Sequence, residues 1–201
     1  MEPSLVKPCS NQPKILLKIV KGCYELAEIL VSAVVAIAVL FLFVARFAGV
    51  IGSSMVPTLH EKDWLAVTSW PAPPEHGQIV IISPRVNAHH EPLVKRVIAL
   101  GGDEVDIRDG RVYVNGNLLE ELYLPEGTVT ETAPWYTSEL TYPAIVPEGS
   151  VFVLGDNRGG SSDSRFEAVG FVSENDVFGR VLFRAMPFYS KETGEFTMRV
   201  K

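Results

Sequence analysis

Apolar and polar residues follow two different patterns along this chain of 201 residues. Residues 29–45, with the sequence ILVSAVVAIAVLFLFVA, form a run without any charged side chain. At about 1.5 Å per residue, a helix over this run covers roughly 25 Å of a hydrocarbon core about 30 Å thick, and flanking residues complete the span. After residue 46 the apolar runs are short or alternate with polar positions, which is typical of β-strands. The pattern therefore predicts one amino-terminal membrane helix and a mainly β domain.

Tight turns connect several of the expected strands. The pairs Asp109-Gly110 and Asn115-Gly116 suit the positive φ angles of hairpin turns, and they predict three consecutive antiparallel strands. The apolar runs that we interpret as strands include residues 78–82, 104–107, 111–114, 150–155 and 180–186. We therefore expect a compact antiparallel β domain that is tethered by the single helix.

Positive charges are concentrated before the apolar run. The lysines that precede it are Lys7, Lys14, Lys18 and Lys21, whereas the next stretch has only Arg46 and then Lys62. The positive-inside rule therefore places the amino terminus in the cytoplasm. We expect a cytoplasmic tail at residues 1–25, a transmembrane anchor at 26–46 and an extracytoplasmic domain at 47–201. The alternatives are a cleavable signal peptide, disfavoured because VARFAGV is a poor exit site, and a buried core helix, disfavoured because the run has no polar face.

Composition limits the possible chemistry of the domain. The net charge is −6 and no basic face is evident, so nucleic acid is not an expected partner. Cys9 and Cys23 both precede the apolar run, which leaves the domain without a thiol nucleophile. The adjacent His89 and His90 have no recognisable ligand spacing. We therefore expect neither a metal nor another cofactor.

The stretch GSSMVPTL contains a candidate nucleophile, Ser54. Gly52 precedes it, Pro57 follows it, and the membrane exit is close. A serine nucleophile needs a base within hydrogen-bond reach, and the four histidines all lie in polar or turn-like sequence. The other possible base is Lys95, in the apolar stretch PLVKRVIAL. One interpretation is an edge lysine that is paired with a carboxylate. The other is a lysine that points inward and whose pKa is lowered by burial. To act as a general base at pH 7, the lysine needs a pKa lowered by roughly three units.

A third stretch, GDNRGGSSDSR at residues 155–165, directly follows the apolar run VFVL. By itself it is a glycine turn with charges that can pair with one another. The three stretches SMVPTL, KRVIALGGDEV and GDNRGGSSDSR, in this order behind an amino-terminal anchor, resemble the type I signal peptidases. These are membrane-bound serine proteases with a Ser/Lys dyad. The resemblance extends from the anchor to Phe183.

The resemblance implies a role for each residue of the site. It makes Ser54 the nucleophile and Lys95 the general base, and it makes Ser161 the serine that orients the Lys95 ammonium. Many bacterial members have a serine where this chain has Gly52, so the oxyanion hole relies on backbone here, chiefly on the Ser54 N–H. The implied ion pairs join Asp156 to Arg96 and Asp163 to Arg165. Such neighbours hold a buried lysine in one rotamer without placing a full counter-charge on it.

The resemblance also implies a substrate. Signal peptides of preproteins would be cleaved after a small-X-small site, with the substrate bound as an extended strand. By position, the implied pocket residues are Val50, Met55, Leu59, Leu93 and Val94. The expected location is the plasma membrane, with a single pass, the catalytic domain on the outer face and the lipid bilayer as a partner. The alternatives are a Ser/Lys peptidase dedicated to one pilin-like or coat protein, and an inactive membrane-tethered peptide-binding module.

Overall fold

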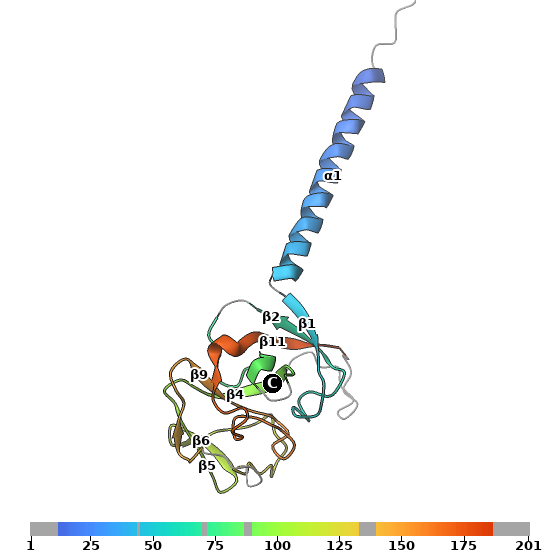
Figure 1. Ribbon diagram of the computed structural model, residues 1–201. Helices are drawn as coiled ribbons and strands as arrows, with labels where there is room; N and C mark the ends of the chain where they lie inside the picture. Colours follow the sequence, from blue (N-terminus) through green and yellow to red (C-terminus); the bar gives the residue numbers. More distant parts are fainter. Residues whose placement is uncertain (1–11, 44, 70–71, 87–89, 133–139, 187–201) are drawn as a thin grey trace, which may run out of the picture. The chain divides into compact units, whose positions relative to one another are not determined.

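The computed structural model describes residues 12–43, 45–69, 72–86, 90–132 and 140–186. The chain divides into two compact units, Met1–Leu42 and Phe43–Lys201. Helix α1 (Gln12–Phe43) accounts for the described part of the first unit, and the strands belong to the second (Figure 1). The predicted fold class, a mainly β domain with one amino-terminal apolar helix, is therefore confirmed.

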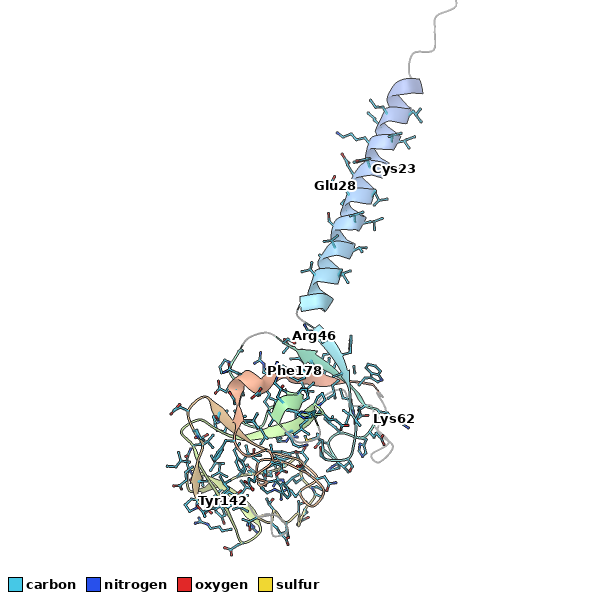
Figure 2. All side chains as sticks on the ribbon, in the orientation of Figure 1. Cys23, Glu28, Arg46, Lys62, Tyr142 and Phe178 are labelled. Atoms are coloured by element: carbon cyan, nitrogen blue, oxygen red, sulfur yellow. The ribbon has the colours of Figure 1, made fainter. Side chains whose placement is uncertain are left out.

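Helix α1 is longer than the apolar run. Its segment Leu16–Val39 is long and apolar enough to cross a membrane, and none of its most apolar window is buried by other residues. Side chains project from α1 on all sides in Figure 2. Pro13 lies in the first turn, where proline is well tolerated, and no later proline interrupts the helix. The helix therefore covers much of the predicted tail at 1–25, of which residues 1–11 lie outside the described residues.

The strands of the second unit form two antiparallel sheets. The larger sheet has the strand order β1-β2-β11-β3-β4-β9-β10, and the smaller has the order β7-β6-β5-β8. The strands are β1 (Ala45–Gly49), β2 (Trp64–Thr68), β3 (Ile79–Ile82), β4 (Leu93–Leu100), β5 (Glu104–Arg108), β6 (Arg111–Val114), β7 (Asn117–Leu118), β8 (Ala144–Ile145), β9 (Ser150–Leu154), β10 (Val172–Ser173) and β11 (Val177–Met186). Two short 3-10 helices occupy Pro84–Val86 and Glu174–Asp176. Arg46, which was expected to close the anchor, lies in β1.

The predicted turns are present. Asp109 and Gly110 have φ angles of 52° and 72°, and Asn115 and Gly116 have φ angles of 51° and 75°. These left-handed conformations match the twist of antiparallel hairpins. They connect β5 to β6 and β6 to β7, so the expectation of three consecutive antiparallel strands is confirmed.

The core is built around β3 and β4. Successive residues of β3 point to opposite faces: Ile79 and Ile81 belong to one buried cluster, and Val80 and Ile82 belong to another. A third cluster packs the smaller sheet against the larger one, with members that include Val105 and Phe152. Strand β4 pairs with β3 along one edge and with β9 along the other, so it lies inside the sheet. Its consecutive residues 95–99 are all buried, so both of its faces are covered. This central strand carries Lys95 and Arg96.

Candidate active site

Ser54 lies in the loop between β1 and β2, and this loop is held in place at both ends. The Val50 N–H donates a hydrogen bond to the Asp63 carbonyl oxygen (2.8 Å). Met55 and Leu59 are buried in the same apolar cluster as Ile79 and Ile81 of β3. Burial of these side chains fixes the loop against the sheet. The half-buried Ser54 is therefore presented from a rigid support.

Gly52 has a φ of +85°, in the left-handed region where side chains cause strain. A Cβ at this position would meet nothing within 4 Å. Backbone conformation, and not lack of space, therefore favours glycine two residues before Ser54.

Lys95 is buried in β4, with 2% of its surface exposed. Its Nζ lies 2.8 Å from Ser54 Oγ and 3.0 Å from the Val94 carbonyl oxygen, both within hydrogen-bond distance. Desolvation lowers the pKa of Lys95 from 10.5 to about 8, although the charges of Asp163 and Asp156 act in the opposite direction. Of the two interpretations open from the sequence, the structure has the inward-pointing lysine. An amine with a lowered pKa beside a hydroxyl is suited to remove its proton.

Arg96 and Asp156 form a buried ion pair beside Lys95. Arg96 lies opposite Leu154, the last residue of β9, in the β4–β9 register. Asp156 follows Leu154 by two residues, which brings its carboxylate within reach of Arg96. Nε donates to Oδ1 (2.9 Å) and Nη2 donates to Oδ2 (2.7 Å), a bidentate arrangement of the strong kind. The Thr58 hydroxyl also donates to Asp156, and this contact joins the Ser54 loop to the ion pair.

Asp163 and Arg165 form a second buried pair. Arg165 Nε donates to Asp163 Oδ1 (2.8 Å), and Nη2 donates to Oδ2 (3.0 Å). The Gly155 N–H also donates to Asp163 (3.0 Å), and Arg165 Nη2 reaches the Arg158 carbonyl oxygen (2.7 Å). These contacts fold residues 155–165 back on themselves.

Ser161 packs against the backbone of Gly155. Its Oγ is buried and makes no hydrogen bond in the described part of the chain, so its role in orienting Lys95 stays a prediction. A Cβ added to Gly155 would overlap Ser161 and would lie 2.5 Å from the Ser54 carbonyl oxygen. Glycine is therefore required at 155 by close approach of the two serines.

The five predicted pocket residues do not form one group. Val50, Met55 and Leu59 are buried in one cluster, and Val94 packs against it. Leu93 packs against the cluster on the other face of β3. Alternation along β4 is the physical reason, because neighbouring residues of a strand point to opposite faces.

Sequence reasoning missed several residues that contact the site. The Asn157 N–H donates to the Ser54 carbonyl oxygen (3.0 Å), and its Nδ2 donates to the Ser53 carbonyl oxygen (3.1 Å). Arg158 is buried, pairs with Glu121 and donates from Nε to the Gly155 carbonyl oxygen (3.2 Å). Only the density of polar residues in GDNRGGSSDSR signals their participation, and it does not name their partners. Among the described residues, no group of three or more His, Cys, Asp or Glu side chains could hold a metal ion.

Comparison with known proteins gives consistent matches. The family model described as "Signal peptidase, peptidase S26" matches residues 23–186. "Probable signal peptidase I-2" of Synechocystis is 35% identical over 170 residues, which are 81% of this chain and 73% of that protein. "Signal peptidase I" of Leptolyngbya laminosa is 34% identical over 190 residues, covering 90% and 86%. A crystal structure of a signal peptidase I from Enterococcus faecalis matches with 37% identity and a TM-score of 0.43, over 54% of this chain and 97% of that one.

The apolar helix, the mainly β unit and the Ser–Lys contact are features of a membrane-bound serine endopeptidase. The family match covers most of the chain and agrees with this class. The chain belongs to the signal peptidase family, peptidase S26. The relatives favour the removal of signal peptides over a dedicated pilin-like substrate or an inactive binding module.

Proposed function

We propose that Ser54 and Lys95 are the nucleophile and the general base with which this chain removes signal peptides from preproteins. The observation that carries the proposal is the 2.8 Å distance between Lys95 Nζ and Ser54 Oγ, together with the burial of Lys95. Buried amines are partly neutral near neutral pH, and only a neutral amine accepts a proton.

In the proposed reaction, the neutral Lys95 takes the Ser54 proton while Oγ attacks the scissile carbonyl carbon. The resulting oxyanion is stabilised by backbone, chiefly by the Ser54 N–H, and Gly52 sets the conformation of this backbone. The C–N bond then breaks, and the Lys95 ammonium returns its proton to the leaving amine. A water molecule, deprotonated by the same lysine, hydrolyses the acyl-enzyme and restores Ser54.

The neighbouring residues act on this pair indirectly. We assign the ion pairs Arg96–Asp156 and Asp163–Arg165 the task of holding β4 and the 155–165 segment in register. Both carboxylates are engaged by arginine, and this limits their attraction for the Lys95 ammonium. Ser161 is the remaining candidate for contact with Lys95, because it lies across Gly155 from Ser54.

The substrate proposed for this site is an extended peptide with small residues at the cleavage position and two positions before it. Main-chain hydrogen bonds would supply affinity, and apolar pockets would select small side chains. Val50, Met55, Leu59 and Val94, which pack together, are the candidates for the pocket floor. Leu93, on the other face, is a weaker candidate.

We infer further that the amino terminus is cytoplasmic and that the catalytic domain lies on the outer face of the plasma membrane. The lysines before the apolar run support this orientation. The nucleophile then follows Arg46 by eight residues (54 − 46 = 8), close to the bilayer from which a signal peptide emerges. The proposed division is a tail at 1–25, an anchor at 26–46 and the domain at 47–201, although the helix itself begins at Gln12.

The test uses the full chain in detergent with a preprotein that carries an Ala-X-Ala site. Wild type, Ser54→Ala and Lys95→Ala are compared, and mass spectrometry identifies the new amino terminus. Cleavage at that site by wild type alone would support both the reaction and the dyad. Persistent cleavage by either variant would place the nucleophile or the base elsewhere.

A further inference from the structure

Tyr123 lies outside the strands, between β7 and β8, but its ring covers a charged group of the site. The Cζ of Arg96 is 3.8 Å from the centre of the Tyr123 ring. Within its own plane, the guanidinium donates to Asp156 from Nε and Nη2 and to the Gly77 carbonyl oxygen from Nη1 (2.8 Å). With these in-plane donors engaged, a face of the guanidinium is the surface left for an aromatic ring. The ring therefore restrains Arg96 from one side of the guanidinium plane, in a direction that its in-plane hydrogen bonds do not.

Tyr123 is itself held by the ion pair between Glu121 and Arg158. Its hydroxyl donates to Glu121 Oε1 (2.7 Å), and it also lies 3.4 Å from Arg158 Nη2. Arg158 Nη1 donates to Glu121 Oε2 (3.0 Å), and the Arg158 side chain is almost fully buried. Burial and the adjacent Glu121 carboxylate raise the pKa of Tyr123, so the hydroxyl stays protonated and remains a donor. The ring is thus held at its hydroxyl end as well as against Arg96.

This arrangement bears on Lys95 through Asp156. Asp163 and Asp156 are the carboxylates that raise the pKa of Lys95 against the effect of burial. Arg165 is bound to the first and Arg96 to the second. If Arg96 moves away from Asp156, the carboxylate keeps a full charge beside the proposed base, and the ammonium form of Lys95 becomes more stable.

We propose that Tyr123 is a positioning residue for the reaction: its ring holds Arg96 on Asp156, and so keeps the charge of Asp156 from stabilising the Lys95 ammonium. This inference rests on the proposed role of Lys95 as the base. Tyr123 contacts Arg96, Glu121 and Arg158, and it acts on the reaction only through such neighbours.

The test compares Tyr123→Leu, which removes the ring, with Tyr123→Phe, which keeps it. We expect kcat for the Ala-X-Ala preprotein to fall about tenfold in the leucine variant at pH 7, with KM changed less than about twofold. The pH at which kcat/KM reaches half of its plateau should rise in the same variant. The phenylalanine variant should retain the wild-type pH profile and at least about a third of kcat, because a phenyl ring covers the guanidinium equally.

Tyr113→Leu is the matched control, because Tyr113 has the same contact with Arg108 (4.2 Å to the ring centre) in the smaller sheet. It should leave kcat and the pH profile unchanged. Circular dichroism checks folding, and Tyr123→Met replaces the leucine variant if that variant does not fold.

The inference is wrong if a folded variant without the ring keeps the wild-type kcat and pH profile, or if the phenylalanine and leucine variants lose activity equally. Ser54→Ala, assayed beside them, separates the two proposals. If Ser54→Ala still cleaves, the proposed function fails whatever the Tyr123 variants do. If Ser54→Ala is inactive and the ring is dispensable, only the role of Tyr123 fails.

Discussion

Lys95 Nζ lies 2.8 Å from Ser54 Oγ, although 41 positions separate the two residues in the chain. Ser54 comes from a loop that is fixed by buried apolar side chains, and Lys95 comes from the centre of the larger sheet. A contact between two rigid supports needs little reorganisation when a substrate binds. The following predictions depend on this contact and on the residues around it.

Lys95→Arg should abolish cleavage. The substitution keeps the positive charge, but a guanidinium does not lose its proton at any physiological pH and cannot act as a base. We expect kcat/KM for the preprotein to fall at least about a thousandfold. Lys62→Arg, at an exposed position, is the control and should be fully active. Measurable turnover by Lys95→Arg would contradict the dyad.

Activity should rise with pH and level off above the pKa of Lys95, which is about 8. The active form is the neutral amine, so kcat/KM should increase about tenfold per pH unit below that value. A pH–rate profile between pH 5 and 10 measures this. A rise that continues to pH 10 would show that Lys95 keeps its ordinary pKa, and the assignment of the base would then be wrong.

The same shift predicts a pH-dependent stability. In the folded chain Lys95 loses its proton near pH 8, whereas in the unfolded chain it does so near 10.5. Between these values the unfolded state binds more protons, so the free energy of unfolding should rise with pH, by about 3 kcal/mol in total. Urea unfolding of wild type and Lys95→Met across this window isolates the contribution. An equal slope in both proteins would rule out Lys95 as its source.

Gly155→Ala should damage both folding and activity. The added Cβ would collide with Ser161 and with the Ser54 carbonyl oxygen, and backbone cannot move aside as a flexible side chain can. We expect at least about a hundredfold loss of kcat/KM, since small misplacements of reacting groups are this costly. Gly159→Ala is the matched control, because a Cβ there meets nothing within 4 Å. Similar behaviour of the two variants would argue against close packing at 155.

Asp156→Asn should destabilise the fold. The change leaves the Arg96 guanidinium buried without its counter-charge, which typically costs about 3 to 5 kcal/mol. Asp106→Asn, which affects the exposed Arg108, should cost less than about 1 kcal/mol. Urea unfolding at pH 7 compares the two free energies. Equal small losses would show that the Arg96–Asp156 pair contributes little.

Local features of this chain were predictable because their causes are local. The run at residues 29–45 is apolar on every side, and the pairs Asp109-Gly110 and Asn115-Gly116 need only their own backbone preferences to turn. The order of the stretches SMVPTL, KRVIALGGDEV and GDNRGGSSDSR behind an anchor was enough to indicate the family. The short strands β1, β8 and β10 were not predicted, because each is stabilised by its neighbours in a sheet more than by its own side chains.

The sequence by itself determined the apolar helix and the mainly β class, and it indicated Ser54 and Lys95 as the proposed nucleophile and base. Tertiary structure decided that Lys95 points inward, because the position of β4 in the sheet and the packing around it set what each face meets. It also decided that Tyr123 lies on Arg96 and that Glu121 pairs with Arg158. These contacts join segments distant in sequence, and no local preference encodes which buried charge a side chain will meet.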